Sequence, residues 1–218
     1  MRLEDLIKPK TQDFIELELY KKLGIQFKEE NDETKTIDTD IDTDTDIDIN
    51  INVESFESFL QKQKQQKEQK TQKPTKDDIL LGDKAINDFN TQVEFYQKHD
   101  LCFGVIDESN IYVINNNIFF IKADLSPIVD KYYINIKTIY SKTNIYLPPE
   151  LRDNTELPFK TRNTLCFYSL GKIIQMLLFH SIELEREKIH KMLGNTSLFF
   201  CLDRATKENP NHRYLILI

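Results

Sequence analysis

Glycine is scarce in this chain of 218 residues, and its few glycines lie far apart in the sequence. Glycine-rich loops of the form G-x-G-x-x-G let the backbone approach the phosphates of a nucleotide closely. No such loop can be formed from the five glycines present, which are Gly24, Gly82, Gly104, Gly171 and Gly194. The sequence therefore excludes the usual glycine-rich cradle for nucleotide phosphates.

Cysteine is equally scarce, and long apolar runs are absent. The three cysteines are an odd number, with no C-x-x-C pair and no metal-ligand spacing to the four histidines, so neither a disulfide framework nor a zinc site is expected. The N-terminal MRLEDLIKPK interrupts its apolar residues with acids and is unlike a signal peptide. The longest apolar stretch, residues 165–179, is too short to span a bilayer. We expect a cytoplasmic protein with reduced thiols and no membrane association.

Positive charge is also in short supply. The net charge is −7, and residues 77–218 hold 16 Lys+Arg against 18 Asp+Glu, a net charge of −2. Nucleic-acid binding needs a positive surface, so nucleic acid is not an expected partner. The hydrophobic fraction of 39% is enough for one folded core beside a tail.

Composition divides the chain into a tail, residues 1–76, and a domain, residues 77–218. Within the tail, apolar residues at helical spacing over 11–24 predict a helix. The acidic run TIDTDIDTDTDIDINI, residues 36–51, lacks the glycine and glutamate that an EF-hand loop needs at its sixth and twelfth positions. Like the Gln- and Lys-rich run 61–76, it is typical of low-complexity sequence.

The domain is predicted to be mainly α with one small β-hairpin. A first helix over residues 85–99 places Ile86, Phe89, Val93 and Tyr96 on one face. Two β-rich runs, Ile111–Ile114 and Ile118–Ile121, are joined by asparagines that favour a hairpin turn. Three further helices are expected: a buried one at 165–179, a surface one at 183–193, and a last one that ends at Asn209-Pro210.

Four motifs follow in a characteristic order: DESNIYVINNNIFFIKADLS from Asp107, YLPPEL from Tyr146, FYSLGKIIQML from Phe167 and ATKENPNHR from Ala205. Together they resemble the catalytic loop and metal-binding segment, the A-P-E elbow, the central helix and the late D-P-x-x-R motif of eukaryotic-type protein kinases. The resemblance implies a fold like the C-terminal lobe of a kinase. The small lobe is expected to be missing or rudimentary, since too little sequence precedes Asp77 for it.

The same resemblance implies that the catalytic residues are lost. Val105 occupies the position of the catalytic aspartate and Lys122 that of the metal-binding aspartate, so no catalytic or metal-binding residue is assigned. Asn110 and Asp124 are the vestigial candidates for cofactor binding, and we interpret Asn110 as a loop-capping side chain. Cys166 stands where the family has an aspartate that steadies the catalytic loop.

Two structural charges of the family are retained. Glu150 of the elbow and Arg213 of the late motif match the positions of a buried ion pair that ties the activation segment to the lobe. The resemblance therefore implies that the anchor of the fold persists although its catalytic groups do not.

Three hypotheses follow for the function. The first is a pseudokinase, a protein-interaction module similar to the KIND domains, which bind protein or peptide partners and use no cofactor. The second is a divergent serine/threonine protein kinase that retains Mg-ATP binding through Asn110 and Asp124. The third is an unrelated helical scaffold, in which Glu150 and Arg213 would lie far apart.

Overall fold

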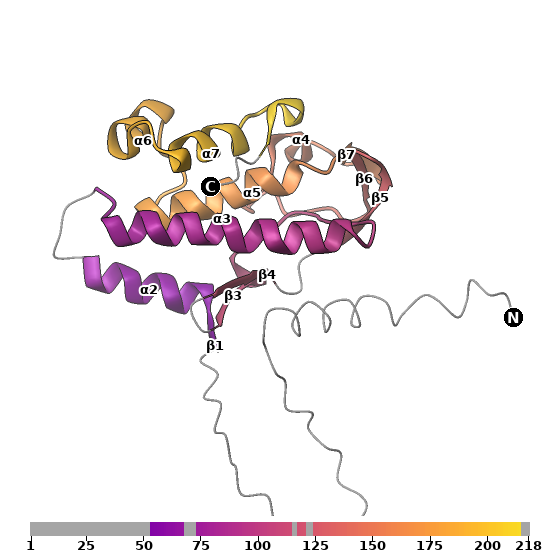
Figure 1. Ribbon diagram of the computed structural model, residues 1–218. Helices are drawn as coiled ribbons and strands as arrows, with labels where there is room; N and C mark the ends of the chain where they lie inside the picture. The colour runs from indigo at the N-terminus through magenta and orange to yellow at the C-terminus, as the bar shows by residue number, and fades with distance from the viewer. Residues whose placement is uncertain (1–52, 68–72, 115–116, 121–123, 215–218) are drawn as a thin grey trace, which may run out of the picture. The chain divides into compact units, whose positions relative to one another are not determined.

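The computed structural model describes residues 53–67, 73–114, 117–120 and 124–214 (Figure 1). These residues belong to one compact unit, Ile51–Ile218. The predicted helix at 11–24 and nearly all of the low-complexity acidic run precede this unit, and both lie outside the described residues, as does Lys122.

Six α-helices form within the described residues, and none is long and apolar enough to cross a membrane. They are α2 (Phe56–Lys67), α3 (Lys76–Gln97), α4 (Pro149–Arg152), α5 (Leu165–Phe179), α6 (Arg186–Leu193) and α7 (Ser197–Ala205). Helix α3 starts nine residues before the predicted Ala85, because Thr75 and Asp78 form a reciprocal capping box at its N-terminus.

The core lies where α3, α5 and α7 pack against one another (Figure 1). The predicted apolar face of α3 is confirmed: its members Ile86, Phe89, Val93 and Tyr96 are all buried. Helix α5 matches its predicted bounds and is buried along most of its length. It approaches α7 so closely at Gly171 that an added Cβ would lie 2.6 Å from the Thr206 side chain.

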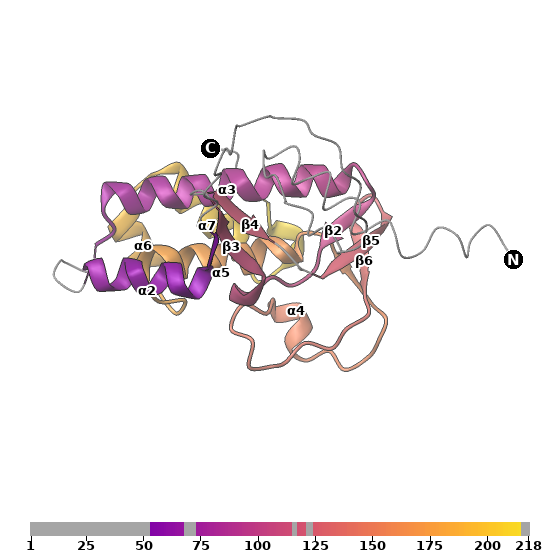
Figure 2. The ribbon, with the colours of Figure 1, turned by 90° about the horizontal axis from the view of Figure 1, so that it is seen from below.

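Seven strands build two antiparallel sheets in the described residues (Figure 2). The first sheet has the order β1-β3-β4 and the second the order β2-β5-β6-β7. The strands are β1 (Val53–Ser55), β2 (Leu101–Phe103), β3 (Ile111–Ile114), β4 (Asn117–Phe120), β5 (Leu125–Asp130), β6 (Tyr133–Ile136) and β7 (Phe159–Arg162). The predicted hairpin is present as β3 and β4, with Ile111 opposite Phe120.

The predicted fold class is nevertheless wrong. The chain is an α/β fold with sheets of three and four strands, and not mainly α with a single small hairpin. The missed strands are short, so they show little periodicity in the sequence. Pro127 in β5 argues against a strand, and FKTR in β7 has one apolar residue. Pairing with neighbouring strands, and not local propensity, fixes these segments as strands.

Strand β1 and helix α2, residues 53–67, pack with the elements that follow Asp77. Strand β1 pairs with β3, with Val53 opposite Ile114, and the Phe56 side chain is completely buried. The segment 53–67, placed in the tail on composition, therefore contributes to the compact unit.

Gln92 connects α3 to the edge of β4. Its side-chain amide nitrogen donates to the carbonyl oxygen of Ile118 at 3.0 Å, and its amide oxygen accepts from the backbone nitrogen of Phe120 at 2.9 Å. Asp88, one turn earlier, accepts from the backbone nitrogen of Ile118 at 2.8 Å. Gln92 is 1% exposed. If its side chain were removed, the backbone groups of Ile118 and Phe120 would have no water to bond in its place.

We predict that Gln92→Leu lowers the free energy of unfolding by about 2–3 kcal/mol, because it leaves buried backbone groups of β4 unpaired. The matched control is Gln97→Leu at the exposed end of the same helix. This substitution should change the free energy of unfolding by less than about 0.5 kcal/mol. Urea denaturation of both variants measures the difference. Equal effects of the two substitutions would show that Gln92 does not hold the sheet to α3.

Candidate functional site

The loop whose sequence resembles a kinase catalytic loop, residues 104–110, follows β2 directly. The backbone nitrogen of Gly104 donates to the carbonyl oxygen of Asp124 at 2.6 Å. A Cβ on Gly104 would lie 2.9 Å from the Tyr140 hydroxyl oxygen and 3.1 Å from the Asp124 carbonyl oxygen. Glycine is therefore needed at position 104 so that the loop after β2 can contact Asp124 and Tyr140.

Val105, which the resemblance aligns with the catalytic aspartate, is buried in the core. It is 4% exposed, and Ile106 beside it is completely buried. An apolar side chain has no atom that accepts a proton or orients a hydroxyl group. The loop thus has no general base at this position.

Asp107, Ser109 and Asn110 hydrogen-bond to one another within the loop. The Asp107 carboxylate accepts from the backbone nitrogen of Ser109 at 2.9 Å and from the Ser109 hydroxyl at 2.5 Å. The Asn110 side-chain oxygen accepts from the backbone nitrogen of Asp107 at 3.3 Å. Together these bonds close the short 3₁₀ helix Glu108–Asn110. The capping interaction expected of Asn110 is present.

Asp124, the second vestigial candidate, is exposed at the other side of the loop. Its carboxylate accepts a hydrogen bond from the Tyr140 hydroxyl at 2.9 Å. Burial and this carboxylate together raise the pKa of Tyr140, so the phenol stays protonated and keeps donating. Among the described residues, no three histidine, cysteine, aspartate or glutamate side chains are grouped to hold a metal ion.

A second tyrosine ties the loop to the elbow. The Tyr146 hydroxyl donates to the Glu108 carboxylate at 3.1 Å, and the Tyr146 carbonyl oxygen accepts from the Ser169 hydroxyl at 3.0 Å. Burial, reinforced by Glu108, raises the pKa of Tyr146. One residue therefore links the loop after β2, the elbow and the central helix α5.

The elbow begins helix α4 with Pro149 and aims Glu150 at Arg213. The two Arg213 terminal nitrogens donate to the two Glu150 carboxylate oxygens at 2.6 and 2.7 Å. The Arg213 side chain is fully buried and that of Glu150 is 13% exposed. This is the bidentate geometry in which a guanidinium and a carboxylate interact most strongly. The structure thus brings together the two charges that the sequence analysis paired.

Arg213 makes further contacts that leave little of its hydrogen-bonding capacity unused. Its Nε donates to the Lys207 carbonyl oxygen at 2.5 Å, and an Nη donates to the Glu208 carbonyl oxygen at 2.7 Å. Its guanidinium lies 5.0 Å from the ring centroid of Tyr168 on α5. The arginine therefore holds the elbow, the central helix and the segment after α7 together.

Cys166, which the resemblance aligns with a loop-steadying aspartate, lies on α5 and is fully buried. Its thiol and that of Cys102 on β2 both donate to the Asn163 carbonyl oxygen, at 3.3 and 3.4 Å. Burial, together with the neighbouring Cys102, raises the pKa of Cys166 well above its ordinary value. The contact between the Cys166 and Cys102 side chains of α5 and β2 is consequently neutral.

The exposed histidines and two surface concavities lie apart from the loop after β2. His99, His190 and His212 are exposed and stand on separate segments, and His180 is half-buried. One concavity, of about 260 Å³, lies between α2 and α3 with Phe59 and Leu80 in its wall. A second, of about 190 Å³, lies between α5 and α7 and includes Lys172. Neither includes Asn110 or Asp124.

No protein-family model matches the chain, and no curated protein matches it either. The interpretation of the site depends on its own residues and their geometry.

Sequence reasoning missed the two tyrosines and the shared carbonyl of Asn163. Tyr140 and Tyr146 fall in a segment whose motif identifies only the elbow, and nothing in their spacing indicates which carboxylate each one meets. Asn163 acts through its backbone, which every residue possesses. These partners are set by tertiary packing and carry no local signal.

We predict that none of the three thiols reacts with a disulfide reagent in the native protein near neutral pH, because all three are buried and unperturbed thiols already ionise only slightly. All three should react in denaturant. Lys98→Cys, which adds a thiol at an exposed position, is the matched control and should react at once. Rapid native labelling of Cys102 or Cys166 would contradict the buried neutral contact between β2 and α5.

Proposed function

We propose that this protein is a degenerate member of the protein-kinase superfamily that has lost phosphoryl transfer and acts as a protein-interaction module. The observation that carries the proposal is the buried Glu150–Arg213 pair beside a loop that has Val105 at the catalytic position. On this proposal the chain keeps the two charges that anchor the fold, Glu150 and Arg213, and has Val105 in place of the catalytic aspartate.

The order of the elements supports the kinase resemblance. A long helix, α3, leads through β2 to the loop, the β3–β4 hairpin follows, and the elbow at α4 precedes the buried helix α5. The late motif then supplies Arg213 after α7. This is the order in which the sequence motifs resemble the family.

The internal bonding of the loop supports the loss of chemistry. Asn110 is bonded to the backbone of Asp107, and Asp124 accepts from Tyr140. Phosphoryl transfer requires a residue that orients the hydroxyl nucleophile and carboxylates that hold magnesium between the phosphates. Val105 has no such group, and the one exposed carboxylate at the loop is that of Asp124.

The three cysteines support a cytoplasmic location for this function. All are free thiols and two of them lie side by side on the Asn163 carbonyl oxygen. Reduced thiols at such close range fit a reducing compartment.

A thermal-shift measurement with ATP and Mg²⁺ tests the proposal. A ligand at about ten times its dissociation constant stabilises by about 1.4 kcal/mol, which raises Tm by about 3–5 °C for a domain of this size. We expect no such shift at millimolar nucleotide, and no transfer of labelled phosphate to the protein or to a generic substrate.

The alternative, a divergent serine/threonine kinase with residual Mg-ATP binding, makes the opposite prediction. Its support is the exposure of the Asp124 carboxylate. A magnesium-dependent shift that Asp124→Ala abolishes, and that the control Asp153→Ala on the exposed elbow surface leaves intact, would overturn the proposed loss of chemistry.

A further inference from the structure

The outward face of the β6–β7 pair carries polar and aromatic side chains. Ile134 and Thr161, opposite each other, are buried on the inner face. Side chains alternate between the two faces of a strand. Tyr133 and Arg162, the next pair in register, therefore lie on the outer face, together with Lys160 two residues before Arg162.

Cations and aromatic rings alternate along this outer face. The Lys131 ammonium lies 5.2 Å from the ring centroid of Tyr132, and the Arg162 guanidinium lies 5.3 Å from the same ring. Arg162 is also 5.6 Å from the ring of Tyr133, and the Lys160 ammonium is 4.7 Å from it. We name these five residues, Lys131, Tyr132, Tyr133, Lys160 and Arg162, the basic hairpin patch.

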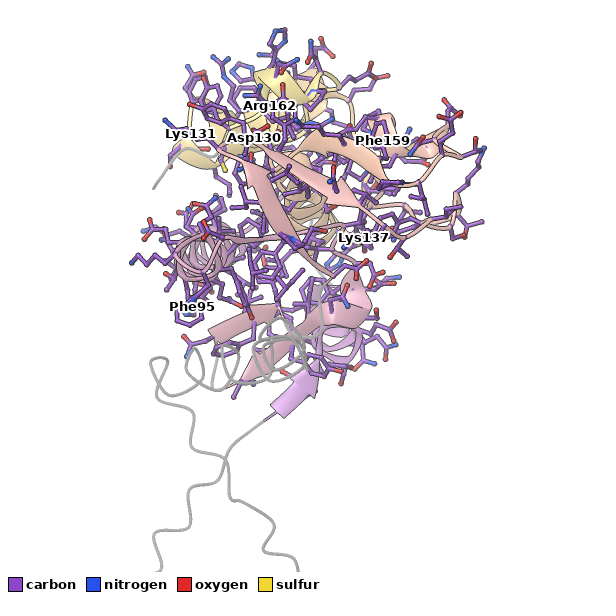
Figure 3. All side chains as sticks on the ribbon, turned by 90° about the vertical axis from the view of Figure 1, so that its right-hand side faces the viewer. Phe95, Asp130, Lys131, Lys137, Phe159 and Arg162 are labelled. Atoms are coloured by element: carbon purple, nitrogen blue, oxygen red, sulfur yellow. The ribbon has the colours of Figure 1, made fainter. Side chains whose placement is uncertain are left out.

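Figure 3 shows where the patch lies. Asp130, Lys131 and Arg162 gather at one end of the β5–β6–β7 sheet, while Lys137 and Phe159 mark its other end. Tyr132 is 47% exposed, although two cations lie within 5.3 Å of its ring centroid. The ring of Tyr132 is thus available at the surface beside these cations.

The patch has more positive charge than its neighbours neutralise. Asp130 is ion-paired with Lys160 at 3.0 Å, and the hydrogen bond from Lys160 lowers the pKa of Asp130. Among the described residues, no carboxylate lies within ion-pair distance of Lys131 or Arg162. Arg162 donates from one terminal nitrogen to the Asn211 side chain at 2.9 Å, and its Nε is buried without a described partner.

This excess stands out because residues 77–218 are acidic as a whole, with a net charge of −2. A long basic stripe would be needed to follow a nucleic-acid backbone, and the patch is a short cluster on one hairpin and its neighbouring strand. Side-chain carboxylates match the guanidinium fork and the ammonium groups, and they need no such stripe.

We propose that the basic hairpin patch binds an acidic segment of a partner protein, rich in aspartate or glutamate. The inference rests on the proposed function in that the partner is a protein. It adds the chemistry of that partner: carboxylates that pair with Lys131 and Arg162, over the exposed ring of Tyr132.

Fluorescence anisotropy with a labelled peptide of alternating glutamate and serine tests the proposal in the full chain. The test variant combines Lys131→Gln, Lys160→Gln and Arg162→Gln. The control variant combines Lys98→Gln, Lys188→Gln and Lys191→Gln, which removes the same charge from exposed positions elsewhere. Thermal unfolding of both variants confirms that each is folded.

We expect the wild-type protein to bind the glutamate peptide at low salt, and its glutamine counterpart not at all. The test variant should bind at least about tenfold more weakly, and the control variant within about twofold of the wild type. Equal weakening of both variants, no binding of the glutamate peptide, or tighter binding of a single-stranded oligonucleotide or an anionic vesicle would each overturn the proposal. A negative result with the glutamate peptide does not alter the outcome of the thermal-shift measurement with ATP and Mg²⁺. The two experiments therefore distinguish failure of the patch proposal from failure of the proposed function.

Discussion

The buried pair of Glu150 and Arg213 is the interaction on which the rest of this structure depends. Two charges taken out of water are costly unless each finds a partner, and here all of the carboxylate and most of the guanidinium are satisfied. The pair fixes the elbow before α5 to the segment after α7. Because Tyr146, next to the elbow, bonds both Glu108 and α5, this anchor also positions the loop that follows β2.

The loop held in this way is built for structure. Val105 has no polar side-chain atom, Asp107 and Asn110 bond within their own turn, and the Cys166 thiol donates to the Asn163 carbonyl oxygen. A side chain such as Val105 cannot orient a hydroxyl nucleophile, as a phosphoryl-transfer site requires. These features are the ones that the proposed function, a fold kept for contacts and not for catalysis, leads us to expect. The cations and aromatic rings proposed to bind a partner lie elsewhere, on the basic hairpin patch.

The parts that were predictable from the sequence are those with strong periodicity or a spaced motif. The apolar face of α3, the bounds of α5, the β3–β4 hairpin and the Glu150–Arg213 pair all have such a signal. The second sheet has none, because β2 and β7 are short and Pro127 interrupts the pattern of β5. The bonds of Tyr140, Tyr146 and Gln92 join segments distant in sequence, so only the folded chain determines them.

A double-mutant cycle on Glu150→Met and Arg213→Met, measured by urea denaturation, tests the central claim most directly. Each single variant leaves one buried charge unpaired and should lose about 3–5 kcal/mol of stability, whereas the double variant removes both charges and should lose much less than the sum. The account predicts an interaction energy of at least about 2 kcal/mol between the two positions. Additive losses, within about 0.5 kcal/mol, would show that the pair does not anchor the fold.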